Sequence, residues 1–110
     1  MKSVVLALGG NAILKKNEKP SIQTQFKNTK KAMKSIANLV KKYSIVITHG
    51  NGPQVGNILI RTEEAIKKAY ALPLFMCVAQ SEGEMGYMIA QSLYNELKKR
   101  GIYLSLIHIW

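Results

Sequence analysis

The sequence predicts an α/β fold, in which a parallel sheet carries helices on both of its faces. Two short, continuous apolar runs, SVVLAL at 3–8 and SIVIT at 44–48, are typical of strands that are buried on both sides. Segments with helical periodicity follow each run. This alternation favours parallel strands joined by helical crossovers, and the expected order of elements is β-α-β-α-α-β.

The first strand and the first long helix are separated by a polar loop. The apolar run ends at Gly9-Gly10, and the polar stretch KKNEKPS at 15–21 contains a proline. Apolar residues then recur every three or four positions, which predicts one face of an amphipathic helix of about five turns. The residues of that face are Ile22, Phe26, Thr29, Met33, Ile36 and Val40.

Two further helices and a third strand are predicted after the second apolar run. One helix begins at Pro53, because a proline in the first helical turn loses no hydrogen bond, and it ends at Ala71-Leu72-Pro73. The last helix runs from about 80 to 100 and stops at Gly101. The chain is apolar again from Ile102, which predicts a third strand. The apolar face of the helix at Pro53 consists of Val55, Ile58, Leu59, Thr62 and Ile66.

Length and composition indicate one small globular domain, or a piece of a larger one. The chain has 110 residues, of which 47% are hydrophobic and 20% charged. No apolar run approaches the roughly 20 residues that cross a bilayer, and no leader peptide is expected, because the first apolar run leads directly into the glycine pair. The single cysteine, Cys77, cannot form an internal disulfide and favours a reducing, cytoplasmic location.

The net charge of +10 has two interpretations, nucleic-acid binding or solvated helix faces. Fourteen of the sixteen basic residues are lysines, and aspartate is absent. Because no aromatic residues interleave with the lysines and no nucleic-acid motif occurs, we favour solvated faces. The lysines that share the first helical segment and its end are Lys27, Lys30, Lys31, Lys34, Lys41 and Lys42.

A glycine-rich turn carrying an asparagine follows each predicted strand. The residues are Gly9, Gly10 and Asn11 after the first strand and Gly50, Asn51 and Gly52 after the second. In parallel sheets, ligands bind beyond the carboxyl ends of the strands. Glycine reaches positive φ and leaves no Cβ atom to block an approaching anion, so backbone N–H groups can form an anion nest. Two such turns predict a crevice for an oxyanion whose charge shifts during group transfer. The alternative is that each is only a tight strand-to-helix turn.

The remaining chemically capable residues have simpler structural interpretations. His49 could orient a ligand, although a histidine that bonds nearby backbone is at least as good an interpretation. Cys77 is expected to be a buried small hydrophobe. Glu82 and Glu84 stand near the predicted start of the last helix, where carboxylates favour the helix dipole. Tyr87 could pack or reach the crevice. No metal-ligand spacing occurs, so no metal site is predicted, and no residue is assigned a catalytic role.

Three blocks of the sequence resemble the N-terminal part of the carbamate kinases, a branch of the amino acid kinase family. They are VVLALGGNAIL at 4–14, VITHGNGPQVGNILI at 46–60 and PLFMCVAQSEGEMGYMI at 73–89. The resemblance is continuous from about residue 2 to residue 102, and HGNGPQVG is its most specific block. It implies a truncated amino acid kinase-like three-layer sandwich, in which residues 1–103 form the carbamate and phosphoryl-site part.

The resemblance also implies a reaction, reversible phosphoryl transfer between ATP and carbamate, which gives ADP and carbamoyl phosphate. The six glycine and asparagine residues would line the carbamate and phosphoryl site. ATP or ADP with magnesium would bind in the part of the family that this chain lacks, so the chain is expected to be inactive alone. A homodimer is expected at full length, with neither nucleic acid nor membrane as a partner. The alternatives are a non-catalytic small-anion-binding module and, third, a basic nucleic-acid binder.

Ala7, Phe75 and the end of the chain depart from the pattern of the broader family. Ala7 stands where the broader family often has a phosphoryl-contacting lysine, a departure that the carbamate kinase branch shares. Phe75 stands where the sequence PLD is more usual, in the loop before the last helix. The end of the chain, LSLIHIW at 104–110, resembles the in-frame translation of a transposase sequencing adapter, so we expect a non-native tail there. A genuine third strand is the alternative.

Overall fold

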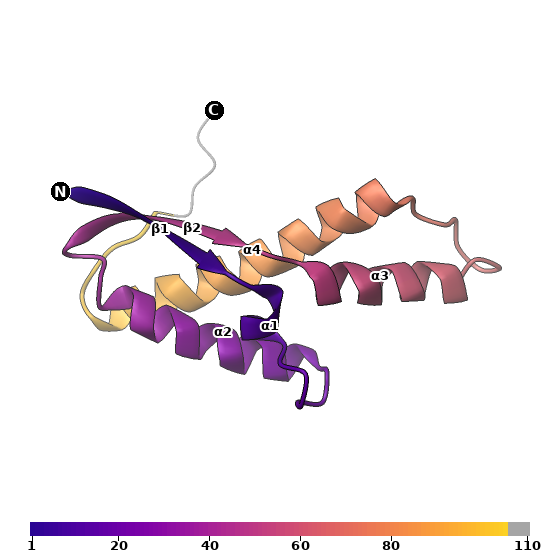
Figure 1. Cartoon of the computed structure of the whole chain (residues 1–110), viewed down its shortest axis with the longest axis horizontal. Coiled ribbons are helices and arrows are strands. Elements are labelled where there is room, and N and C mark those ends of the chain that lie inside the picture. The colour runs from indigo at the N-terminus through magenta and orange to yellow at the C-terminus, as the bar shows by residue number, and fades with distance from the viewer. Residues whose placement is uncertain (106–110) are drawn as a thin grey trace.

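The computed structural model describes residues 1–105, along which two strands and four helices follow one another (Figure 1). They are β1 (Lys2–Leu8), α1 (Gly10–Ile13), α2 (Ile22–Ala37), β2 (Tyr43–His49), α3 (Gly52–Glu64) and α4 (Leu74–Lys99). The short helix α1 was not predicted. Residues 102–105 are irregular rather than a strand, and the rest of the predicted third strand and of the predicted tail lies outside the described residues.

The two strands form a parallel sheet, which confirms the predicted α/β class. Lys2 lies opposite Tyr43 and Leu8 opposite His49, so the strands are in register over their whole length. Helix α2 connects them as the crossover that a parallel pair requires. Because of this register, the chain leaves both strands at the same edge of the sheet.

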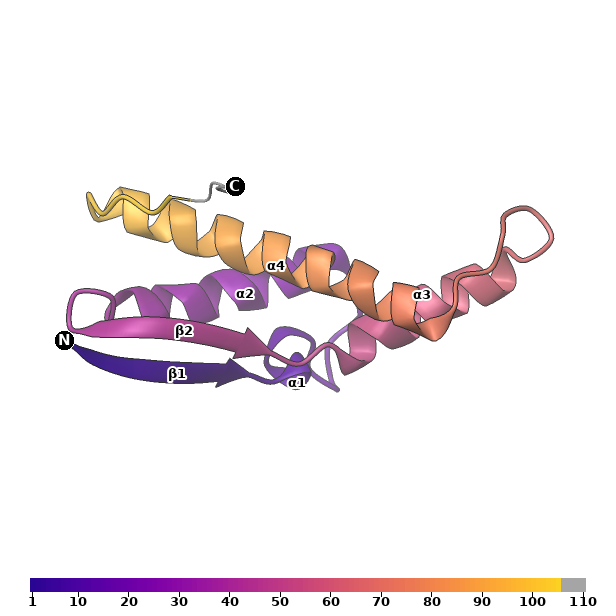
Figure 2. The same ribbon diagram turned by 90° about the horizontal axis from the view of Figure 1, so that it is seen from above.

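One face of the sheet packs on the helices. The inward side chains of both strands alternate with outward ones, as the period of two requires, and contact the core. Those inward residues are Leu6, Leu8, Ile45 and Ile47. The core beneath them comes from α1, α2 and α4 and consists of Ile13, Met33, Ile36, Met85, Met88 and Ile89. Figure 2 shows α2 and α4 stacked on the same side of the two strands.

The other face of the sheet is open, and here the prediction of helices on both faces is not met within residues 1–105. Val5 is 67% exposed and Val46 is 56% exposed, so neither strand is buried on both sides. The continuous apolar runs were interpreted as doubly buried strands, but every helix of the described part that contacts the sheet packs on its inner face. The apolar outer residues therefore face solvent.

Helix α2 begins where the sequence predicts and ends earlier. The Ser21 hydroxyl oxygen accepts a hydrogen bond from the Thr24 backbone N–H at 3.0 Å, which caps the first turn. At the other end, the Leu39 N–H donates to the Ile36 carbonyl rather than one residue further back. This tighter turn ends the helix at Ala37, before Val40.

Helix α4 begins six residues before the predicted start. Pro73 is its N-cap. A proline is tolerated there because the N–H of that residue takes no part in the hydrogen bonds of the helix. Glu82 and Glu84 consequently lie inside the helix, so their predicted placement at the helix start is wrong. The predicted stop at Gly101 is confirmed: Gly101 has φ of +73°, and the Ile102 N–H donates to the Leu97 carbonyl at 2.9 Å.

The lysines singled out in the sequence are all exposed, as the solvated-face interpretation expects. The positions are Lys27, Lys30, Lys31, Lys34, Lys41 and Lys42. Among the described residues, no helix combines the length and the apolar character that crossing a membrane needs.

Candidate functional site

The two glycine turns lie side by side at the carboxyl end of the sheet (Figure 1). The Gly50 N–H donates to the Leu8 carbonyl at 2.8 Å, which extends the parallel ladder one residue beyond the strands. The first turn then enters α1, and the second enters α3, which projects beyond the sheet in both views (Figure 2). The predicted meeting of the two turns is therefore what the structure shows.

Gly10 and Gly50 are packed so tightly that a Cβ atom on either would require a neighbouring atom to give by a few tenths of an ångström. A Cβ atom on Gly50 would lie 3.2 Å from the Gly10 nitrogen. A Cβ atom on Gly10 would lie 3.0 Å from Pro53 Cδ and 3.6 Å from the Gly52 nitrogen. The distances of 3.2 and 3.0 Å are shorter than Cβ contacts normally are, whereas 3.6 Å is an ordinary van der Waals contact. Glycine at these two positions thus permits the backbones of the two turns to touch.

Positive φ is not the reason for these glycines, which corrects part of the sequence argument. Among the described residues, Gly101 is the glycine with positive φ, and no turn glycine adopts that conformation. Gly9, for example, has φ of −68° and ψ of 149°, an extended geometry that any residue can adopt. At Gly10 and Gly50, the absence of a Cβ atom is therefore the property that the packing of the turns depends on.

Gly9 and Gly52 border open space rather than protein. A Cβ atom on either would meet no atom within 4 Å. Gly52 is also the first residue of α3, and its asparagine N-cap makes no side-chain cap hydrogen bond. The first N–H groups of a helix of this length carry a partial positive charge. The arrangement offers backbone donors beside an unfilled space, which suits an anion.

The two asparagines, which the sequence treats as equivalent, have different environments. The Asn51 Nδ2 donates to the Ser81 Oγ at 2.8 Å, and the Ser81 hydroxyl donates to the Val78 carbonyl. Asn51 thereby ties the second turn to α4. Asn11, by contrast, is exposed in the first turn of α1. Its amide is available to a ligand.

A buried polar layer supports the turns from beneath, and sequence reasoning missed it. Gln54, in the first turn of α3, is 2% exposed, and its Nε2 donates to the Gln25 Oε1 of α2 at 3.1 Å. The Gln54 Oε1 has no hydrogen-bond partner and lies 3.6 Å from the point where a Gly10 Cβ would stand. The sequence carried one signal that Gln54 is buried, namely its spacing: Gln54 precedes the core residue Ile58 by four positions and so shares its helix face.

Helix α1 is fixed by a second buried amide. The Asn28 Nδ2 donates to the Ile13 carbonyl at 2.9 Å and to the Glu18 carboxylate at 2.8 Å. Ile13 itself is completely buried in the core. The first turn is therefore anchored on α2 by hydrogen bonding and by packing, which keeps Gly9 and Gly10 in place.

The other residues considered from the sequence take structural places. The His49 ring nitrogen Nδ1 lies 3.3 Å from the Gly50 carbonyl, the backbone contact that the simpler interpretation expects. Cys77 is fully buried, as expected of a small hydrophobe. Tyr87 packs edge-on against Phe26, with ring centroids 6.2 Å apart, and so takes the packing alternative. Phe75 is 71% exposed in the first turn of α4.

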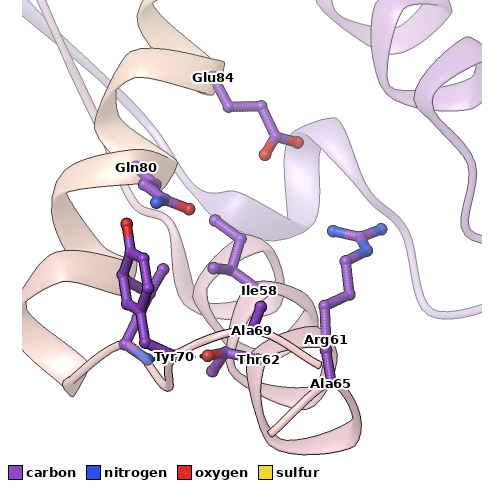
Figure 3. Close-up of a pocket in the computed structure, with 9 residues that line it drawn as sticks. Ile58, Arg61, Thr62, Ala65, Ala69, Tyr70, Gln80 and Glu84 are labelled. Carbon is purple, nitrogen blue, oxygen red and sulfur yellow. Dashed lines mark hydrogen bonds between the residues drawn. The ribbon is translucent and has the colours of Figure 1, made fainter. Parts of the chain in front are cut away.

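A separate groove lies between α3 and the start of α4 (Figure 3). Its volume is about 560 Å³, and Arg61 and Glu84 extend toward it from the two helices. The groove contains none of the six predicted site residues. Within residues 1–105, no group of three or more metal-binding side chains gathers there or elsewhere.

Comparisons with known proteins agree on one family. The model of the amino acid kinase family matches residues 2–109. The chain is 45% identical over 107 residues to a carbamate kinase of Thermococcus kodakarensis, a match that covers 93% of this chain and 34% of that protein. It is likewise 45% identical to a carbamate kinase of Escherichia coli K12 over 93 residues, covering 84% of this chain and 31% of the relative.

Solved structures give the same result. The carbamate kinase of Giardia lamblia bound to AMP-PNP matches with a TM-score of 0.90 at 40% identity, covering 94% of this chain and 36% of that one. The chain thus spans about a third of the length of the curated relatives it matches.

Proposed function

Because the chain belongs to the amino acid kinase family, we propose that it forms the carbamate- and phosphoryl-binding wall of a carbamate kinase. The reaction would be reversible phosphoryl transfer between ATP and carbamate, with carbamoyl phosphate and ADP as the other pair. Residues 1–103 would form this wall, and the rest of the family chain would complete the enzyme. The compartment would be the cytoplasm, and the complete enzyme would be a homodimer.

The observation that carries the proposal is the contact between the two glycine turns. Gly50 abuts the Gly10 backbone, so the turns form one continuous surface rather than two independent connections. Phosphoryl transfer requires chiefly positioning and stabilisation of charge that moves between oxygens. A surface of fixed backbone donors at a helix N-terminus supplies both without a reactive side chain.

The predicted residues divide into two roles on this surface. Gly9 and Gly52 would leave the space in which the carbamoyl phosphate group lies, since a Cβ atom there would meet no protein atom. Gly10 and Gly50 would hold the turns together. Asn11 would donate to an oxygen of the moving group, and Asn51 would keep the second turn fixed on Ser81.

The nucleotide would be held by residues outside this chain. No nucleotide-binding motif occurs in the sequence, and the residues around the turns offer no carboxylate cluster for magnesium within the described part. The Giardia lamblia relative was solved bound to AMP-PNP, which supports a nucleotide as the partner of the complete enzyme. We therefore assign no described residue to ATP or magnesium, and we expect the chain alone to be inactive.

The test is formation of ATP from carbamoyl phosphate and ADP, followed by a coupled assay. We expect no ATP formation by the 110-residue chain alone. If sequencing across codon 103 finds a native reading frame that continues, we expect the longer product of that frame to form ATP. Clear turnover by the chain alone would refute its inactivity. A folded, longer product that binds carbamoyl phosphate without making ATP would instead support the non-catalytic anion-binding module.

A further inference from the structure

A second cavity lies between α2 and the C-terminal part of α4, and it shares no residue with the glycine turns or with the groove of Figure 3. Its volume is about 500 Å³, which is within the usual range for sites that bind small molecules. Figures 1 and 2 show the end of α4 on the side of the molecule where the strands begin, whereas the glycine turns lie where the strands end. The lining residues are Lys30 from α2 and Ser92, Asn95, Glu96, Lys98 and Lys99 from α4.

Ser92 is the residue of this cavity that points to a ligand. It is 4% exposed, and its Oγ atom has no hydrogen-bond partner among the described residues. A buried polar group without a partner destabilises the fold, so native proteins retain few of them. Ser81, another buried serine of α4, instead donates its hydroxyl to the Val78 carbonyl at 2.6 Å. The Ser92 hydroxyl is therefore free to bind an occupant of the cavity that it lines.

The charge of the cavity indicates the sign of that occupant. Its lining carries three lysines and one carboxylate. The Glu96 carboxylate is already paired, because it lies 3.2 Å from the Arg100 Nη2 and 3.9 Å from the Lys99 Nζ. Lys30 and Lys98 therefore leave the cavity positive. Because an ammonium group has three donors and no acceptor, the lining favours an anion with several oxygens.

We propose that this cavity binds the phosphate group of a small anion, either free phosphate or a phosphomonoester, with Lys30, Ser92 and Asn95 as donors. A phosphate group presents several strong acceptor oxygens and close to two negative charges at neutral pH, which suits donors that come from two helices. A carboxylate has two oxygens and one charge, and so uses fewer of these donors. The cavity is separate from the glycine turns, so this proposal does not rest on the proposed function.

The test is a titration of the 110-residue chain, labelled with ¹⁵N, with inorganic phosphate and with phenyl phosphate. The amide resonances of residues 30 and 92–99 report on the cavity, and those of residues 9–11 and 50–52 report on the glycine turns. Lys30→Gln removes a lining cation, and Lys31→Gln removes the same charge one position away, outside the cavity. We expect Lys30→Gln to weaken binding at the cavity roughly tenfold and Lys31→Gln by less than about twofold, because solvent screens an exposed charge that makes no direct contact.

Ser92→Ala separates a ligand-binding hydroxyl from a structural one. Without ligand, this variant should unfold at the same or a higher urea concentration than wild type, because it removes a buried polar atom that has no partner. Its binding of phenyl phosphate at the cavity should nevertheless weaken by roughly threefold to tenfold. Ser81→Ala is the matched control: it removes a hydroxyl that does have partners and should unfold at a lower urea concentration.

Saturable shifts at residues 30 and 92–99 that weaken in Lys30→Gln and Ser92→Ala support the proposal. Tighter binding of phenyl phosphate then indicates an ester as the source of the phosphate group, and equal binding indicates free phosphate. Shifts at the glycine turns alone overturn the proposal and leave the proposed function standing. Equal weakening by Lys30→Gln and Lys31→Gln also overturns it, because attraction by net charge then explains the binding. So does unchanged binding by Ser92→Ala.

Discussion

Gly50 lies against Gly10 so closely that a Cβ atom on Gly50 would come within 3.2 Å of the Gly10 backbone nitrogen. This contact joins the turn after β1 to the turn after β2. Both turns are also fixed from outside, the first by Asn28 on α2 and the second by Ser81 on α4. The relative position of the two turns is therefore built into the packing of the whole chain.

Replacing Gly50 by alanine should lower the free energy of unfolding by about 1–3 kcal/mol, because the neighbouring atom is backbone and must move. Gly56→Ala is the matched control: Gly56 lies inside α3 and its Cβ would meet nothing within 4 Å, so the change should stabilise by about 0.5–1 kcal/mol. Urea unfolding of the chain measures both. Equal stability of the two variants would show that the turns are not in contact.

The hydrogen bond from Asn51 to Ser81 should appear as a coupling in a double-mutant cycle. We expect Asn51→Ala and Ser81→Ala to couple by about 0.5–1.5 kcal/mol, since each change removes the same 2.8 Å bond. Asn11→Ala, in the other turn, should change stability by less than about 0.5 kcal/mol. Additive effects of the first pair would contradict the assignment of Asn51 as a structural tie.

The buried pair Gln25 and Gln54 should tolerate joint replacement better than single replacement. Gln25→Met leaves Gln54 with neither amide end paired and should destabilise by about 1–3 kcal/mol. Gln25→Met/Gln54→Met removes the unpaired Gln54 oxygen as well and should be closer to wild type. Thermal unfolding compares them. A double variant that is less stable than Gln25→Met would mean that the Gln54 oxygen has a partner.

Arg100 joins the end of α4 to the end of α2. Its Nη1 donates to the Asn38 Oδ1 at 2.6 Å, and its Nη2 donates to the Lys34 carbonyl at 3.2 Å. Lysine cannot reproduce this planar arrangement, so Arg100→Lys should destabilise by about 1 kcal/mol. Lys99→Ala, which removes an exposed ion pair at 3.9 Å, should cost less than about 0.5 kcal/mol. A larger loss in the second variant than in the first would contradict this account.

The strands and the glycine turns could be predicted from the sequence because their signals are local. The apolar run at 3–8 is followed by Gly9, and the run at 44–48 is followed by His49 and then Gly50. The observed strands, Lys2–Leu8 and Tyr43–His49, exceed these runs by one residue at one end and by one residue at each end, respectively. The position of both turns at the same edge of the sheet followed from the parallel pairing of the strands alone. The helix stop at Gly101 was equally predictable, because glycine readily adopts the left-handed conformation that ends a helix.

Features that depend on tertiary packing could not be predicted. Pro73 was interpreted as the end of the helix that begins at Pro53, but α3 ends earlier, at Glu64, and Pro73 instead begins α4, so the start of α4 was placed too late. The buried amides of Gln54 and Gln25 look like ordinary surface residues in the sequence. Likewise, an apolar run in the sequence does not reveal whether both faces of the strand that it forms are covered by other elements. Val46 is exposed because no element of the described residues covers its face of the sheet.

The most direct test of the central claim is the activity of Gly52→Ala in a fusion of residues 1–103 with the part of the Thermococcus kodakarensis carbamate kinase that lies beyond its matched segment. Gly52 borders open space, so alanine should leave the unfolding free energy within about 0.5 kcal/mol of wild type. If carbamoyl phosphate occupies that space, ATP formation from carbamoyl phosphate and ADP should fall roughly a hundredfold, while Gly56→Ala should retain full activity. Unchanged ATP formation by a folded Gly52→Ala fusion would contradict the claim that the glycine turns form the substrate wall.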